Sequence, residues 1–535
     1  MEKKSDDPRP VPAERPVFGL SRRVWYLLAG CFGLMIFSRL VFPPSSSSLT
    51  GHYSTSRGLL TAADYLNASA SEPAPFAFCP DFGPDDAVAA KRGQVALLKS
   101  RLHLGTGARV QRLIHKAMTG QPVTVSVLGG SITACHGAGD DPVSPRCWPS
   151  KFFEWWNGVF PHPLSQLYNG AARLTDSAYF AYCSKHHMPD HADLVILEFD
   201  ASDPNDPLWM NHFELLVRSI LTRPEQPAVI LLGHFAPQVL VQNKFTGPEM
   251  LHDIVAQFYD VPHISMKGAL YADYMSDPEG TRQAYYSDMV LASPAGHDML
   301  ADLLISYFQS QICAGWATTM GHAFDVPYMG AGQSSGVNPL LNVDADDLEA
   351  QGGGLAAKAR AMRVPPARLA NRPSDILTFR EAEPYCVIAN EIVNPIPPSH
   401  FFGSGWQTYK PVNEGPEVKA YWWSEVGGSR MRVPIKTSAG DVAIYYLQHP
   451  DSTASGRVAC WVDDDFGNRV ELNGINKNVG QPTPTLTTIN EGVEAGDHYV
   501  ECLVLGKEGA KLPPFKMMGV WVAQKRFQLT ARFAT

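Results

Sequence analysis

Short apolar runs alternate with segments of helical spacing between residues 122 and 308, and this alternation limits the fold more than any other feature of the chain. The apolar runs, which have the length and composition of buried strands, are residues 122–131, 194–199, 228–235 and 261–266. The segments with helical spacing are residues 149–160, 208–223, 252–259 and 296–308. Strands separated by helices favour a parallel sheet with helices on both faces. We therefore predict an α/β fold, a flavodoxin-like doubly wound parallel sheet, for residues 86–316.

The C-terminal part of the chain has a different pattern. Its β-rich runs, separated by turn residues and by no helical segment, are residues 441–447, 457–464, 498–505 and 515–523. Such runs predict an antiparallel β-sandwich, which we assign to residues 385–535. Glycine-rich stretches between the two regions indicate a linker over residues 317–384.

An apolar run near the N-terminus has the length of a membrane span. Residues 24–42 number 19, and at ~1.5 Å per residue they reach roughly 28 Å, close to the thickness of a hydrocarbon core. Six Lys and Arg residues precede the run, and positive charge is retained in the cytosol. A cleaved signal peptide competes, but prolines follow the run in place of small residues. We predict a cytosolic tail (1–23), a transmembrane signal anchor (24–42) and a stem (43–85) of a single-pass type II membrane protein of the Golgi or ER.

The cysteines fit a luminal location. The chain has nine, of which Cys31 lies in the expected anchor, and the remaining even number suggests disulfides. Cys460 and Cys502 lie in strand-like runs and are candidates to pair with each other across the β domain. Asn67 begins the sequon Asn67-Ala-Ser69 just outside the membrane, and we expect it to be glycosylated.

Composition and spacing argue against several kinds of partner. A net charge of −9 without a long basic run is a poor match to nucleic-acid binding. We expect no metal and no cofactor, because no Cys/His zinc spacing occurs and the histidines of 186–191 have no grouped carboxylates. The aromatic cluster 421–423 fits either a platform that stacks on sugars or ordinary core packing, as do Trp406 and Trp461.

The segment LGGSIT, residues 128–133, is the feature most indicative of chemistry. A β-run delivers Ser131 through two glycines into a polar turn. Glycine permits a tight turn that leaves a hydroxyl and nearby N–H groups open to a substrate. The alternative is a glycine turn in which Ser131 caps a helix.

Together with its neighbours, this segment resembles the SGNH/GDSL hydrolase superfamily. GGSIT is similar to the nucleophile block, and residues 169–183, 194–206 and 288–297 are similar to the three blocks that follow it. The anchor and the C-terminal β domain are similar to those of fungal proteins that include basidiomycete capsule-associated proteins. The resemblance implies that Ser131 is the nucleophile of acyl transfer.

The resemblance also implies roles for residues in the later blocks. Asp288 is the candidate carboxylate that orients a histidine, and His297 is the candidate base. Gly170, Asn205 and Ser202 are the candidates for binding the oxyanion together with the Ser131 N–H. Ser202 stands where the superfamily usually has asparagine.

The last block departs from the superfamily at its most important position. Leu291 stands where the catalytic histidine is usual, and a leucine cannot accept a proton from Ser131. Histidines elsewhere that are candidates to replace it are His136 and His234.

Two functions follow from these observations. The first is a membrane-anchored esterase or acyltransferase that acts on acyl esters of a glycan, such as a capsule or wall polysaccharide. The alternative is a catalytically inactive SGNH fold that binds or scaffolds polysaccharide, which Leu291 and Ser202 favour. The two share a glycan partner and differ in whether Ser131 reacts. The sequence does not fix the oligomeric state.

Overall fold

The computed structural model describes most of the chain beyond the expected stem. The described residues are 51–53, 60–67, 75–173, 175–319, 363–379, 381, 384–389, 405–409, 421–477 and 483–524. The expected tail and anchor, residues 1–42, lie outside them. Within the part of the chain that is described, no helix combines the length and the apolar character needed to cross a membrane.

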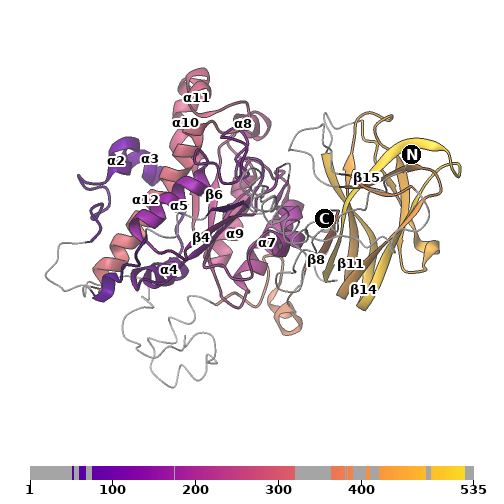
Figure 1. The fold of residues 1–535 in the computed structure, drawn as a ribbon, viewed down its shortest axis with the longest axis horizontal. Coiled ribbons are helices and arrows are strands. Elements are labelled where there is room, and N and C mark those ends of the chain that lie inside the picture. Colours follow the sequence, from indigo (N-terminus) through magenta and orange to yellow (C-terminus); the bar gives the residue numbers. More distant parts are fainter. Residues whose placement is uncertain are drawn as a thin grey trace, which may run out of the picture. The chain divides into compact units, whose positions relative to one another are not determined.

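A seven-stranded sheet forms the centre of the α/β domain, in the order β1-β4-β3-β5-β6-β7-β2 (Figure 1). Its strands are β1 (Gly51–Tyr53), β2 (Arg101–His103), β3 (Thr124–Gly129), β4 (Gln166–Asn169), β5 (Leu194–Glu198), β6 (Ala228–Gly233) and β7 (His263–Ser265). The five central strands are parallel. The sequence predicted β3, β5, β6 and β7 in such a sheet but did not predict β4. The two edge strands, β1 and β2, are antiparallel to their neighbours and were not predicted.

Helices cover both faces of this sheet. They are α2 (Ala87–Arg92), α3 (Gln94–Lys99), α4 (Ala108–Met118), α5 (Trp148–Val159), α6 (Ser177–Cys183), α7 (Pro207–Leu221), α8 (Pro237–Asn243), α9 (Pro248–Tyr259), α10 (Met266–Ser276), α11 (Pro278–Tyr285) and α12 (Pro294–Thr319). Alternate residues of β5 point to opposite faces. Leu194 and Ile196 pack in the core that contains α4, α5 and α12, whereas Val195 and Leu197 pack with α6, α7 and α9.

The C-terminal domain is an antiparallel sheet of eight strands among the described residues. They are β8 (Tyr385–Ile388), β9 (Gln407–Tyr409), β10 (Tyr421–Val426), β11 (Arg430–Gln448), β12 (Arg457–Val462), β13 (Val470–Asn473), β14 (Thr483–Val504) and β15 (Lys511–Gln524). The sequence predicted a sandwich of two sheets. Hydrogen bonding connects all eight strands, and β11 and β14 pair along almost their whole length despite register shifts near Gly440.

Short 3-10 helices complete the described elements: Tyr65–Asn67, Ser184–His186, Pro373–Thr378 and Phe466–Asn468. The expected glycosylation site, Asn67, is the last residue of the first of these.

Disulfides connect both domains internally and to each other. The pairs are Cys79–Cys313, Cys135–Cys147, Cys183–Cys386 and Cys460–Cys502. The eight cysteines outside the expected anchor are therefore all oxidised, and the predicted pairing of Cys460 with Cys502 is present. Cys183 ends α6 and Cys386 lies in β8, so one disulfide joins the α/β domain to the β domain.

Candidate active site

Ser131 lies in the turn that follows β3, at the carboxyl edge of the central sheet. Gly129 and Gly130 precede it at positions where no side chain fits. An added Cβ on Gly129 would lie 2.8 Å from the Glu198 carbonyl oxygen, and one on Gly130 would collide with Ser202 Oγ. Ser131 itself is half-buried. The two glycines therefore let the turn pack directly against the end of β5, where open α/β sheets bind their ligands.

Buried side chains of β4 and β5 form hydrogen bonds with the turn that carries Ser131. Thr133 Oγ1 donates to Glu198 Oε2 at 3.0 Å, and both residues are fully buried. Burial raises the pKa of Glu198 to about 8, so this carboxyl is mostly neutral at pH 7. Asn169 Nδ2 donates to the Thr133 carbonyl at 2.8 Å. The position of the turn is thus fixed from β4 and from β5.

Ser202 is the predicted oxyanion residue that lies nearest the turn. A Cβ added to Gly130 would collide with the Ser202 hydroxyl, so this hydroxyl lies against the glycine. The Thr175 carbonyl oxygen would lie 3.1 Å from the same added Cβ. Ser202 is half-buried on the loop after β5. A hydroxyl in this place can donate a hydrogen bond at the edge where Ser131 lies.

The other two predicted oxyanion residues make different contacts. The Gly170 N–H donates to the Val127 carbonyl at 3.0 Å, so it extends the pairing of β3 with β4. Asn205 is exposed, and its amide donates to Asn243 Oδ1 at 3.4 Å. Neither contact directs a donor toward Ser131.

Asp288 and His297 lie in the last block but face different surroundings. Asp288 is exposed, and its Oδ1 accepts the N–H groups of Val290 and Leu291, both at 2.7 Å. This carboxylate therefore caps its own turn. His297 is fully buried, and its Nδ1 accepts the Trp148 N–H at 3.4 Å at the start of α5. Burial lowers the pKa of His297 to about 3.

Leu291 borders the turn that carries Ser131. A Cβ placed on Gly137, in the same turn, would lie 3.6 Å from Leu291 Cβ and 3.2 Å from Ser287 Oγ. The structure therefore brings the first and last blocks together, as the resemblance implies. The residue that the last block presents to the turn is a leucine.

His136 lies in the Ser131 turn and contacts a carboxylate that also pairs with an arginine. Its Nδ1 lies 2.8 Å from Asp140 Oδ1, and Arg173 Nη2 lies 3.0 Å from the same oxygen. The hydrogen bond from His136 is the largest influence that lowers the pKa of Asp140. His136 was predicted from the sequence as a candidate base, but Asp140 was not predicted.

A buried network of carboxylates and histidines fixes the loop after β5. His252 Nδ1 lies 2.6 Å from Asp200 Oδ1, and its Nε2 lies 2.9 Å from Asp203 Oδ2. His263 Nε2 lies 3.4 Å from Asp200 Oδ2. Burial opposes the charge on both histidines, but the hydrogen bonds and charges of the carboxylates outweigh it. The pKa of His252 rises to about 9 and that of His263 to about 10.

No pattern in the sequence predicted this network. Asp200 and Asp203 lie in a quoted block, but His252 and His263 come from α9 and β7, and only the fold brings the four together. Asp203 Oδ1 also accepts the Ser177 N–H at 2.7 Å, which ties the loop to the start of α6. Because Ser202 lies between the two aspartates, the network positions the residue that meets Gly130.

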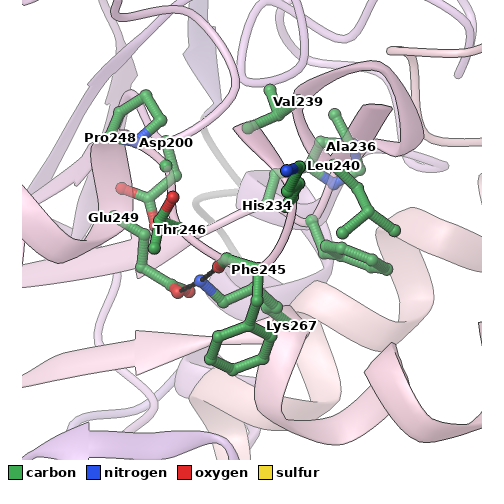
Figure 2. A pocket seen from close by; sticks show the side chains of 13 residues that line it. Asp200, His234, Ala236, Val239, Leu240, Phe245, Thr246, Pro248, Glu249 and Lys267 are labelled. Carbon is green, nitrogen blue, oxygen red and sulfur yellow. Dashed lines mark hydrogen bonds and ion pairs between the residues drawn. The ribbon is translucent and has the colours of Figure 1, made fainter. Parts of the chain in front are cut away.

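A small cavity lies beside this network, at the carboxyl ends of β5, β6 and β7. Figure 2 shows Asp200 and His234 on its wall, with Lys267 directed toward Glu249 and the Phe245 ring alongside. Lys267 Nζ pairs with Glu249 Oε2 and donates to the Phe245 carbonyl at 3.1 Å. The cavity has a volume of ≈ 20 Å³, which is room for about one water molecule. In this form the cavity does not admit a sugar.

The remaining clusters that the sequence singled out have structural partners. His187 Nε2 lies 2.7 Å from Tyr179 Oη, and the His186 ring lies 3.3 Å from the Cys386 carbonyl. Tyr421, Trp422, Trp406 and Trp461 are buried and belong to or pack within the β domain. Their faces are not open to a sugar, so core packing accounts for these four rings.

Comparisons with known proteins show the fold. No family model matches the chain, and no curated protein matches it. Among solved structures it is similar to a two-domain esterase active on acetylated mannans, with 18% identity and a TM-score of 0.56. The match covers 81% of this chain and 99% of that one. The same esterase co-crystallised with mannopentaose gives a TM-score of 0.55 at the same identity and coverage. The chain therefore shares the fold of that two-domain structure, a mixed α/β sheet followed by an antiparallel β domain.

Proposed function

We propose that this protein is a membrane-anchored carboxylic ester hydrolase or O-acyltransferase of the secretory pathway that acts on acyl esters of a polysaccharide, with Ser131 as nucleophile. The observation that carries the proposal is the Ser131 turn. It combines a half-buried serine, two glycines without room for a side chain, and the Ser202 hydroxyl at the carboxyl edge of the sheet. A structural neighbour with the same two domains acts on acetylated mannans, which supports a glycan ester as substrate.

The membrane anchor and the organelle come from the sequence. Residues 24–42 and the charged tail before them indicate a type II orientation. The four disulfides agree with an oxidising lumen.

A second function is a glycan-binding protein without catalysis, and it also has a specific observation. Leu291 occupies the place of the usual base, and the predicted substitute His297 is fully buried against α5. In this alternative the fold binds a polysaccharide and Ser131 does not react. The two functions differ in a single measurable property, the hydrolysis or transfer of an acyl group.

The test uses the full chain purified in mild detergent. Release of acetate from acetylated mannan and from an aryl acetate is measured for wild type and Ser131→Ala. Ser219→Ala is the matched control, because the Ser219 hydroxyl donates to the Leu216 carbonyl within α7. We expect activity in wild type and the control and none in Ser131→Ala. Glycan binding without any Ser131-dependent acyl release would favour the second function.

A further inference from the structure

We propose that His136, oriented by Asp140, is the general base of the Ser131 site, so that the nucleophile and its base stand on one turn of the chain. This inference rests on the proposed esterase or acyltransferase function. The last block has Leu291 in place of a basic histidine, and in this inference the base comes from the first block.

The backbone of the turn holds Ser131 and His136 together. The His136 N–H donates to the Ser131 carbonyl at 3.0 Å, and the Ala134 N–H donates to the Gly130 carbonyl at 3.0 Å. The Cys135–Cys147 disulfide closes the same loop. The distance between the two residues is therefore set by local structure and does not depend on a distant loop.

Asp140 gives His136 the geometry that a base requires. The ring Nδ1 lies 2.8 Å from Asp140 Oδ1, and the Gly137 N–H donates to the same oxygen at 3.3 Å. Arg173 forms an ion pair with the same carboxylate. In the neutral imidazole the nitrogen that faces a carboxylate carries the hydrogen, so Nε2 is the basic nitrogen. The pair thus reproduces the carboxylate–histidine half of a catalytic triad.

His136 lies close to Leu291, the position at which the last block lacks a histidine. Its neighbour Gly137 contacts the Leu291 loop, with 3.6 Å between an added Cβ and Leu291 Cβ. The side chain of His136 is 26% exposed. It therefore lies on the turn that borders the missing histidine, and it is accessible to solvent and substrate.

Other histidines at this edge of the sheet are poorly suited to take the proton. His234 is buried, its Nε2 bonds the Val290 carbonyl at 2.8 Å, and burial lowers its pKa to about 4. His297 is buried with a still lower pKa, of about 3. His252 and His263 have raised pKa values of about 9 and 10, so they are already protonated at neutral pH.

Acyl transfer needs only Ser131, His136, the acyl ester, and water or a second sugar hydroxyl. His136 Nε2 accepts the Ser131 proton as Oγ forms a bond to the acyl carbon. The bond from that carbon to the sugar oxygen breaks, and the His136 proton passes to the leaving sugar hydroxyl. A water molecule, or a second sugar hydroxyl in a transferase, then attacks the acyl-enzyme and gives its proton to His136. The bond between the acyl carbon and Ser131 Oγ breaks, and His136 returns this proton to Oγ. The products are the free acid or a new ester, the deacylated sugar and regenerated Ser131.

The experiment measures kcat and KM of the full chain in detergent on an aryl acetate and on acetylated mannan. His136→Ala is expected to lower kcat by about 10²-fold or more at nearly unchanged KM, the usual worth of a positioned base. Free imidazole is expected to restore part of the loss, which a merely unfolded variant would not show. Asp140 is a positioning residue, so Asp140→Asn is expected to lower kcat at constant KM and to alter the acid limb of the pH–rate profile.

The matched control is His191→Gln. His191 also pairs with a carboxylate, Asp193 at 3.2 Å, but at the amino end of β5, on the opposite edge of the sheet. It is expected to keep wild-type kcat. Ser131-dependent activity that survives in both His136→Ala and His136→Gln would overturn this inference and leave the proposed function standing. A wild type without acyl release, made active by Leu291→His, would overturn both.

Discussion

The buried network around Asp200 makes the stability of the α/β domain depend on pH in a defined direction. His252 and His263 are held between carboxylates, with native pKa values of about 9 and 10. An unfolded histidine titrates near ~6.5. A raised native pKa means that the stabilisation is fully present below that unfolded value and is lost as the pH rises through the native value. We therefore expect the free energy of unfolding to fall between pH 6.5 and 9.

The size of the effect follows from proton linkage. In this window the native chain holds one more proton per histidine than the unfolded chain. Each such proton changes the free energy of unfolding by about 1.4 kcal/mol per pH unit. For His252 alone, with its native pKa of about 9, the loss from pH 6.5 to 9 is about 3 kcal/mol by this slope. His263 adds to the loss in the same direction.

The perturbation is Asp200→Asn, which keeps the shape of the side chain but removes the charge that both histidines face. The assay is urea unfolding with the disulfides intact at pH 6.5 and 9, and its readout is the difference in pH dependence between wild type and variant. Wild type should lose more than the variant over this range, by up to about 3 kcal/mol per histidine, because Asp203 still faces His252 and Asp253 still faces His263 in the variant. His191→Gln should behave as wild type. Equal pH dependence in wild type and Asp200→Asn would refute the reasoning, since the Asp200 charge would then not hold extra protons on the two histidines.

Three further predictions test other parts of the structure. Gly130→Ala should cost about 10²-fold in kcat, because its Cβ collides with Ser202 Oγ and displaces the nucleophile; a fully active Gly130→Ala would contradict the packing. Replacing Cys135 and Cys147 by serine should lower the free energy of urea unfolding by about 3 kcal/mol and weaken ester hydrolysis; unchanged stability would count against the loop closure. Asn67→Gln should abolish the gel shift caused by N-glycosidase, whereas a shift retained in the variant would place the glycan elsewhere.

The central sheet was predictable because its strands are apolar on both faces. β3, β5 and β6 are buried along nearly their whole length, and apolar residues dominate each of them, although β3 also contains Thr124 and Ser126. β4 has no such run and was not predicted. The edge strands β1 and β2 have three residues each and no such run, so pairing with a neighbour defines them. The long hairpin of the β domain was missed for a related reason. The sequence analysis began this strand only at residue 441, yet β11 begins at Arg430 and its pairing with β14 continues through register shifts near Gly440.

Some residues of the candidate site could be predicted from local sequence, and others depend on tertiary packing. The position of Ser131 follows from a strand that ends in glycines, which is local information. The contacts of Asp288 and His297 depend on how the last loop and α5 pack, and block order alone cannot supply them. The network of Asp200 and His252 joins residues 52 positions apart, and no local pattern marks it. The Ser131–His136 turn is local, but its importance emerges only once Leu291 is seen to border it.

The most direct test of the account is to label the nucleophile chemically. The full chain is treated with a fluorophosphonate, which phosphonylates activated serines, and its peptides are mapped by mass spectrometry. The account predicts modification of Ser131, competition by acetylated mannan, and a much slower reaction in His136→Ala. A chain that hydrolyses esters while Ser131 stays unmodified, or in which another serine carries the label, would contradict the central claim.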